Sequence, residues 1–151
     1  LTILNQGITF KKMKPAQMLN ALQQKIQADF PALADVTFEL RTVHDSMKDY
    51  LSPAFYLTPP MDTGTPNVIY INPAASYQGL ELFTTLAHEG FPGHLYQTVT
   101  FERQNPSGIR NLLCTSGFAE GWATYIEPFA YQYAAGYIKD PSATELAGSP
   151  G

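Results

Sequence analysis

The sequence predicts an α+β fold, rich in helix, in which a small mixed or antiparallel sheet is followed by further helices. Within residues 35–71, two short stretches show alternating apolar side chains or a cluster of β-branched residues, which is the pattern of strands. Residues 15–29 and the residues after 77 instead place apolar side chains three and four positions apart, which is the helical period. A helix, then strands, then helices within 151 residues indicates a single domain of the α+β class.

The first helix is expected near residues 15–29. Pro15 suits the first helical position, because the N–H that proline lacks would be unpaired there in any residue. Leu19, Leu22 and Ile26 then form an apolar stripe at helical spacing. This helix should bury that stripe against the rest of the domain.

Two strands are expected after this helix, the first at 35–43 and the second at Val68-Ile69-Tyr70-Ile71. In the first, Val36, Phe38 and Leu40 alternate with polar residues, as in a half-buried strand. The remaining segments of this region are assigned as a short helical turn at 45–52, an extended and irregular stretch at 53–60, and a turn at 62–66.

The chain should be helical again after residue 77. One helix leads into His88, and a second is expected from Pro92 toward Gln104. A loop at 105–108 separates these from a long apolar and aromatic helix over about 117–137. Pro128 falls inside this last helix and removes one backbone hydrogen bond, so we expect a kink there.

Composition excludes several classes of protein. The net charge of −4 and the lack of a basic block argue against nucleic acid as a partner, and no apolar run is long enough to span a bilayer. The single cysteine, Cys114, excludes an internal disulfide framework and is expected to be a buried thiol. The chain begins without Met, and residues 147–151 look like a disordered or linker tail. We therefore expect a piece of a longer protein, whose localisation stays unknown.

The segment 88–94 reads His-Glu-Gly-Phe-Pro-Gly-His and carries the residue types of a zinc hydrolase site. In the motif H-E-x-x-H, two histidines on one helical face bind zinc, and the glutamate handles the proton of a water. Here the second histidine follows six residues after the first, which on a straight helix means about 600° of rotation and about 9 Å of rise. Both nitrogens must lie about 2.0–2.1 Å from zinc, so a straight helix cannot supply both ligands.

The residues between the two histidines favour the break that this spacing requires. Pro92 cannot donate to the carbonyl of His88, and its ring clashes there in a regular helix. Gly90 and Gly93 permit backbone angles that other residues avoid. We expect this segment to interrupt the helix and turn His94 back toward His88, with Pro92 as the first residue of the next helix.

Catalytic zinc commonly takes three protein ligands and leaves one position for water. Glu120 stands in a mostly apolar segment, where an acid usually needs a partner, and it is the candidate for the third ligand. Glu127 shares its helical face and is either a hydrogen-bond partner of a ligand or an alternative ligand. Gln97, one turn after His94, is a further candidate for such a partner. Glu89 would take the proton of the activated water and pass it to the leaving amine.

Two segments closely resemble a known family. Residues 88–97 read His-Glu-Gly-Phe-Pro-Gly-His-Leu-Tyr-Gln, and residues 119–127 read Ala-Glu-Gly-Trp-Ala-Thr-Tyr-Ile-Glu. Both resemble the bacterial domain-of-unknown-function family numbered 885, which looks like a relative of the gluzincin metallopeptidases. The segments Ser-Pro-Ala-Phe-Tyr at 52–56 and Val-Ile-Tyr-Ile-Asn at 68–72 resemble it as well. The resemblance runs from about residue 15 to residue 137, and the pairing of the first two motifs is its specific part.

This resemblance implies a zincin-like core with a defined set of roles. The implied roles are His88 and His94 as zinc ligands, Glu120 as the third ligand and Glu89 as the general base. The resemblance also implies a substrate-binding edge strand around Tyr70 and Asn72. Those two side chains and that of Tyr56 are candidates for substrate contact, with sheet packing and turn formation as the alternative interpretation.

The leading hypothesis is a zinc-dependent hydrolase, with zinc as cofactor and a peptide as substrate. One alternative is a non-catalytic module that binds metal or peptide, which the retention of Glu89 disfavours because a structural site needs no base. Another alternative keeps the zinc but takes a non-peptide amide or ester. Members of the resembled family are several-fold longer, so we expect this chain alone to show weak activity or none, and whether it binds zinc by itself is left open.

Overall fold

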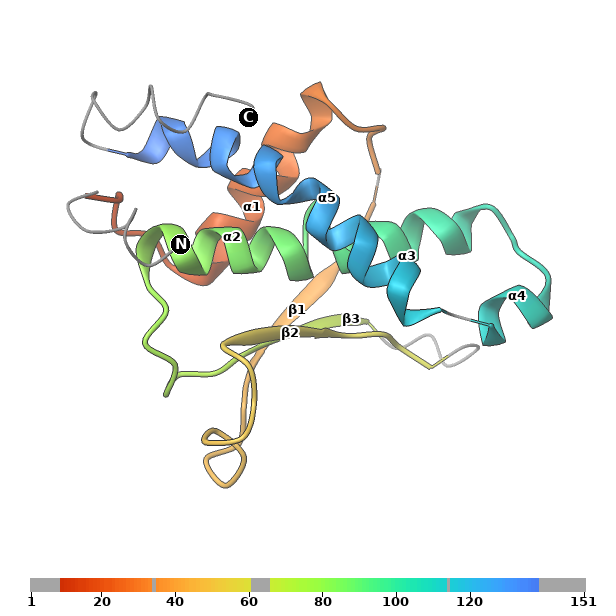
Figure 1. Cartoon of the computed structure of the whole chain (residues 1–151), viewed down its shortest axis with the longest axis horizontal. Coiled ribbons are helices and arrows are strands. Elements are labelled where there is room, and N and C mark those ends of the chain that lie inside the picture. The colour runs from red at the N-terminus through yellow and green to blue at the C-terminus, as the bar shows by residue number, and fades with distance from the viewer. Residues whose placement is uncertain (1–8, 34, 61–65, 114, 139–151) are drawn as a thin grey trace.

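The computed structural model describes residues 9–33, 35–60, 66–113 and 115–138, and the statements below concern these residues. Its helices lie on one side of a small sheet (Figure 1). The elements in chain order are α1 (Pro15–Lys25), the 3₁₀ turn η1 (Ile26–Ala28), β1 (Phe38–Thr42), β2 (Ala54–Leu57), β3 (Asn67–Ile71), α2 (Gly79–Glu89), α3 (His94–Arg103), α4 (Gly108–Leu112), α5 (Ser116–Ala134) and the 3₁₀ turn η2 (Ala135–Tyr137). The predicted helix-rich α+β class is confirmed.

The sheet is mixed and has the strand order β1-β3-β2. β1 runs parallel to β3, with Leu40 opposite Ile69, and β2 runs antiparallel to β3, with Tyr56 opposite Ile69. Two expectations are wrong here. The strand around Tyr70, β3, lies in the centre of the described sheet, and its edges are β1 and β2. β2 is the edge strand that contacts Glu89. Residues 54–57 are extended, as expected, but they form this regular strand instead of an irregular stretch, because a local pattern rich in proline does not reveal pairing with a distant strand.

The main helices agree with the sequence pattern. α1 begins at Pro15, as predicted, and its last turn tightens into η1. α5 and η2 together cover the stretch predicted at 117–137, and Pro128 lies inside α5. The kink expected at Pro128 stays a prediction. The five-residue helix α4 was not predicted, because five residues carry too little periodicity to be recognised.

The connecting segments are partly as expected. Residues 45–50 form successive turns, in which the Met47 N–H donates to the His44 carbonyl at 2.9 Å and the Tyr50 N–H donates to the Met47 carbonyl at 3.1 Å. His44 is exposed, as expected of a loop histidine. The buried thiol expected at Cys114, the tail at 147–151 and most of the turn at 62–66 lie outside the described residues.

The core lies between the helices and the sheet. α2 packs against both α1 and α5, and the apolar stripe of α1 is buried as predicted. Fully buried side chains come from each layer: Leu19 and Leu22 of α1, Ile69 of β3, Phe83 and Leu86 of α2, and Ile126 of α5. α2 is therefore held on several sides just before its last residues, His88 and Glu89. Among the described helices, none is long and apolar enough to cross a membrane.

Candidate metal centre

A buried break separates α2 from α3, as the spacing of the histidines required. α2 ends at Glu89, and α3 begins at His94 with Gly93 as its N-cap. The Gly93 N–H donates to the Ala87 carbonyl at 3.0 Å, so the chain folds back over the last turn of α2. Pro92 does not begin α3, contrary to expectation. The Phe91–Pro92 peptide bond is cis, and Pro92 lies wholly inside the buried break.

Close backbone contact explains both glycines of the break. A Cβ added at Gly93 would overlap the carbonyl group of His88. A Cβ at Gly90 would lie 2.6 Å from Cδ2 of Leu19 and 2.8 Å from the Leu86 carbonyl oxygen. Neither position can take a larger residue without moving the backbone or the core. The conformation that brings the two histidines together therefore depends on these two residues.

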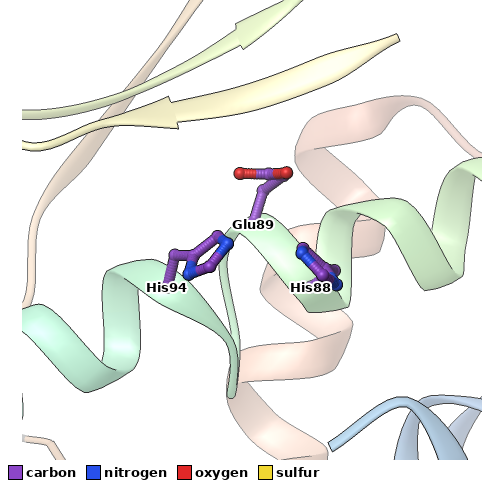
Figure 2. A group of neighbouring side chains, drawn as sticks. All are labelled: His88, Glu89 and His94. Atoms are coloured by element: carbon purple, nitrogen blue, oxygen red, sulfur yellow. The ribbon is translucent and has the colours of Figure 1, made fainter. Parts of the chain in front are cut away.

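The break places the imidazoles of His88 and His94 next to each other. Their ring centroids lie 4.8 Å apart with an angle of 86° between the planes, and Figure 2 shows the two side chains side by side. Both side chains are largely buried, with exposed fractions of 22% for His88 and 17% for His94. Two imidazoles held this close can share one metal ion as ligands.

Glu120 of α5 reaches both histidines. One carboxylate oxygen lies 3.6 Å from Nε2 of His88, and the other lies 3.5 Å from Nε2 of His94. Ligands in a tetrahedral zinc site, each about 2.0–2.1 Å from the ion, lie about 3.4 Å from one another. The measured separations are close to that value. A ligand nitrogen of His88 and one of His94 lie within 4.8 Å of each other. The three side chains thus lie near enough to one another to approach a common ion.

Glu127 contacts the other nitrogen of His88. Its Oε1 lies 3.3 Å from Nδ1, on the opposite side of the ring from the nitrogen that Glu120 approaches. A carboxylate at Nδ1 fixes the proton there and leaves Nε2 unprotonated, which is the form that binds a metal. Glu127 was expected to be either an alternative ligand or a hydrogen-bond partner of a ligand. This geometry favours the second role, with His88 as the candidate ligand that it contacts.

Glu89 lies beside the histidine pair and beneath the edge strand. One of its oxygens is within 4.8 Å of the ligand nitrogens of His88 and His94, and Figure 2 shows its carboxylate directed toward the strands. Its Oε2 accepts the main-chain N–H of Tyr56 at 2.9 Å. Glu89 could be counted as a ligand in place of Glu120. We prefer Glu120, because each of its oxygens lies 3.5 or 3.6 Å from a histidine nitrogen, whereas Glu89 is held by the strand.

Burial changes the pKa of two groups in the site. It raises the pKa of Glu89, and the charge of Glu120 adds to this effect, whereas the Tyr56 N–H and His88 oppose it. A carboxylate with a raised pKa is better matched to accepting and returning a proton near neutral pH. Burial also lowers the pKa of His94, with His88 acting in the same direction. His94 is therefore kept neutral, as a metal ligand must be.

The residues expected to contact substrate have other partners. The Asn72 side chain is buried and donates to the carbonyls of Lys48 and Leu51 at 2.7 and 2.9 Å, so it secures the loop before β2. The ring of Tyr70 stacks on Phe55 at 5.1 Å, with 11° between the planes. These contacts are turn formation and sheet packing, which was the alternative interpretation for both residues.

The other two candidates, Gln97 and Tyr56, differ in how they relate to the site. Gln97 lies on α3 one turn after His94 and is partly exposed, and its role stays a prediction. The phenol of Tyr56 is turned away from substrate contact, since its hydroxyl donates to Oδ1 of Asn67 at 2.7 Å. The main-chain N–H of Tyr56, by contrast, belongs to the site.

Sequence reasoning missed two contacts that build the site. The first is the bond from the Tyr56 N–H to Glu89, for which local sequence carries no signal. The second is the indole of Trp122, which donates to the Pro92 carbonyl at 2.8 Å and ties α5 to the break. The Trp122 ring also packs against the core, on Phe30 and Tyr96. Its proximity to Glu120, and the need of a buried indole for an acceptor, were the available signal.

Comparison with known proteins shows the fold and the family of the chain. A search of curated proteins found no match. A solved structure described as a "putative lipoprotein" from Colwellia psychrerythraea has a similar fold, with a TM-score of 0.73 and 18% sequence identity. The match covers 97% of this chain but 27% of that one, so the chain spans about a quarter of that protein. The family model described as "Bacterial protein of unknown function (DUF885)" matches residues 14–146, and the chain belongs to this family.

Proposed function

We propose that this site is the centre of a zinc-dependent hydrolase and that the enzyme is a metallopeptidase. The observation that supports this proposal most is the position of Glu120, whose two oxygens lie 3.5 and 3.6 Å from the Nε2 atoms of His94 and His88. A separate carboxylate, Glu89, lies beside the same nitrogens. Two neutral imidazoles and one carboxylate form a common ligand set of catalytic zinc.

The proposed cofactor has one chemical function here. When bound by His88, His94 and Glu120, zinc supplies a Lewis acid that lowers the pKa of a water and polarises a carbonyl oxygen. Oxygen and nitrogen ligands of this kind, without thiolates, leave the ion able to act in this way. Glu127 supports the set by keeping the proton of His88 on Nδ1.

Glu89 performs the proton transfers in this proposal. Its carboxylate takes one proton from the attacking water as the new C–O bond forms at the carbonyl carbon. It then delivers the same proton to the amine nitrogen as the C–N bond breaks, so the group returns to its starting state. The Tyr56 N–H holds one oxygen of Glu89 throughout, and the raised pKa of Glu89 suits both transfers.

The edge strand favours a peptide as substrate. The main-chain N–H of Asn72 donates to the Pro53 carbonyl at the end of the β2–β3 pair. The main-chain groups of odd-numbered β2 residues therefore point toward β3, and those of even-numbered residues point outward. The outward main-chain groups lie on the side of Glu89, as the bond from Tyr56 requires. An extended peptide can pair with such an edge. A non-peptide amide or ester gains nothing from it.

Zinc binding and mutation of the base together test the proposal. Glu89→Gln should keep zinc in this chain and abolish turnover in a longer family member with the equivalent change. A matched control is Glu39→Gln, because Glu39 pairs with Arg41 on the exposed sheet surface. Turnover should be measured with a peptide library and zinc by titration. Full activity of the Glu89 variant, or no zinc binding, would contradict the proposal.

The second candidate is a module that binds metal or peptide without cleavage. The exposed edge of β2 is the observation in its favour, since strand pairing needs no base. Zinc bound at the site without cleavage of any peptide, amide or ester would favour this candidate. Loss of peptide binding on changing β2, with no effect of Glu89→Gln, would support it further.

We also infer export of the intact protein, from the description of the structural neighbour as a "putative lipoprotein". Fractionation of cells that express the full protein tests this inference. Recovery in the envelope fraction is expected, and recovery with cytoplasmic markers alone would contradict it.

A further inference from the structure

The edge strand β2 makes an unusual contact with Glu89, the proposed general base. Tyr56 lies on β2, whose ladder with β3 uses the main-chain groups of the odd-numbered residues. The Tyr56 N–H therefore points away from the sheet, where such a group normally meets water. Here it donates to Oε2 of Glu89 at 2.9 Å. This bond joins two segments that are 33 residues apart.

The side chain of Tyr56 is fastened by its hydroxyl. The hydroxyl donates to Oδ1 of Asn67 at 2.7 Å, and the Asn67 amide donates in turn to the Thr37 carbonyl at 3.3 Å. Burial raises the pKa of the phenol. The phenol thus ties β2 to the first residue of β3 and, through Asn67, to the residue that precedes β1.

We propose that Tyr56 is a positioning residue for Glu89. Its phenol fixes β2 against β3, and its main-chain N–H then holds the carboxylate of Glu89 beside the histidine pair. Glu89 is one residue past His88, at the end of α2, and the break follows directly. Without the strand, its side chain would be free to rotate toward solvent. This inference rests on the proposed function and adds to it the residue that orients the base.

A direct role in substrate binding fits Tyr56 less well. The hydroxyl of Tyr56 already donates its proton to Asn67, so it has none to donate to a substrate. Tyr70 gives the contrast, because it lies in register opposite Phe55 and stacks on it. The two tyrosines thus lie on neighbouring strands, but only the position of Tyr56 is tied to the site.

Amide hydrogen exchange on this chain tests the bond without any need for activity or metal. An outward N–H at a sheet edge exchanges readily, so protection of Tyr56 must come from Glu89. In Glu89→Ala we expect the exchange rate at Tyr56 to rise on the order of tenfold or more, with the rates at Phe55 and Leu57 unchanged. Glu89→Asp, shorter by one methylene, should have the same effect if the alanine variant unfolds. Unchanged exchange at Tyr56 would overturn the proposal.

Steady-state kinetics distinguish a positioning role of Tyr56 from a direct contact between Tyr56 and the substrate. Tyr56→Phe in a longer family member should lower kcat on the order of tenfold, because a misplaced catalytic group costs rate more than binding. KM and zinc affinity should stay as in the parent. Tyr70→Phe is the matched control and should change neither constant. A rise in KM with unchanged kcat would show that Tyr56 contacts substrate and overturn the proposal. If no peptide is cleaved, the proposed function fails while the exchange result still decides the role of Tyr56.

Discussion

The histidine pair and Glu120 belong to two very different regions of the molecule. His88 and His94 flank a break whose four residues are buried, and a Cβ at Gly93 would overlap the His88 carbonyl group. Glu120 lies in the first half of α5, where most residues are exposed, and 64% of its side-chain surface is accessible. The core therefore determines where the histidines lie. The position of Glu120, the proposed third ligand, depends on one exposed stretch of helix.

This difference separates stability from metal binding. Changes at the break should damage the fold and the site together, because the same contacts maintain both. Changes at Glu120 should affect the metal alone, since an exposed side chain contributes little to folding. The following predictions test this separation, in order of expected effect.

Gly93→Ala should have the largest effect. The added methyl group cannot fit against the His88 carbonyl group, so the break must change shape. We expect a loss of about 3 kcal/mol or more in the free energy of unfolding, together with loss of zinc binding. Urea unfolding and zinc titration measure the two effects.

Gly121→Ala is the matched control for this change. A Cβ at Gly121 meets nothing within 4 Å, and the position is inside α5, so alanine should stabilise the chain by about 0.5–1 kcal/mol. If both variants lose stability, or neither does, the buried break is not the rigid part of the site.

Glu120→Ala should abolish tight zinc binding without destabilising the metal-free chain. It removes one of three ligands, so we expect the affinity to fall by more than the roughly 10- to 100-fold typical of outer partners. The free energy of unfolding without zinc should stay within about 0.5 kcal/mol of the parent, because the side chain is exposed. Zinc titration and urea unfolding check both values. Unchanged zinc affinity would exclude Glu120 as a ligand.

Glu127→Ala should weaken zinc binding by roughly 10- to 100-fold, because it leaves His88 Nδ1 without its acceptor. Glu127→Gln retains an oxygen acceptor and should lose less. Zinc titration of the two variants compares them directly. If Glu127→Ala has a larger effect than Glu120→Ala, Glu127 is the ligand and Glu120 its partner.

The smallest expected effect is on how the stability of the metal-free chain depends on pH. Burial lowers the pKa of His94 from its usual 6.5, so the folded chain binds fewer protons there than the unfolded chain. The resulting stability is present above about pH 6.5 and is lost as the pH falls through the folded pKa. The metal-free chain should lose stability in urea between about pH 7 and about pH 5, and His94→Gln should reduce that loss.

Two controls keep this comparison specific to His94. Glu89 has a raised pKa and contributes the opposite slope, because its folded form binds more protons than its unfolded form. His44→Gln, at an exposed loop position, should leave the pH dependence unchanged. Equal loss of stability in the parent and in His94→Gln would contradict the prediction.

The same contrast explains how much could be predicted from the sequence. The break was predictable, because a spacing of six residues from one histidine to the next excludes a straight helix, and glycine and proline permit a bend. The position of Glu120 near the histidines was predicted from an acid in an apolar stretch, and its role as a ligand stays a prediction. The edge strand was assigned wrongly, because strand order depends on pairing between distant segments. The bond from Tyr56 to Glu89 could not be predicted for the same reason, since any residue at position 56 has a main-chain N–H.

The most direct test of the metal centre is the diffraction of a zinc-soaked crystal of this chain, recorded on both sides of the zinc absorption edge. The predicted result is one anomalous peak within about 2.0–2.2 Å of Nε2 of His88, Nε2 of His94 and a carboxylate oxygen of Glu120, with Glu89 unbound beside it. A peak coordinated by Glu89 in place of Glu120, or the lack of any peak at the histidine pair, would contradict it.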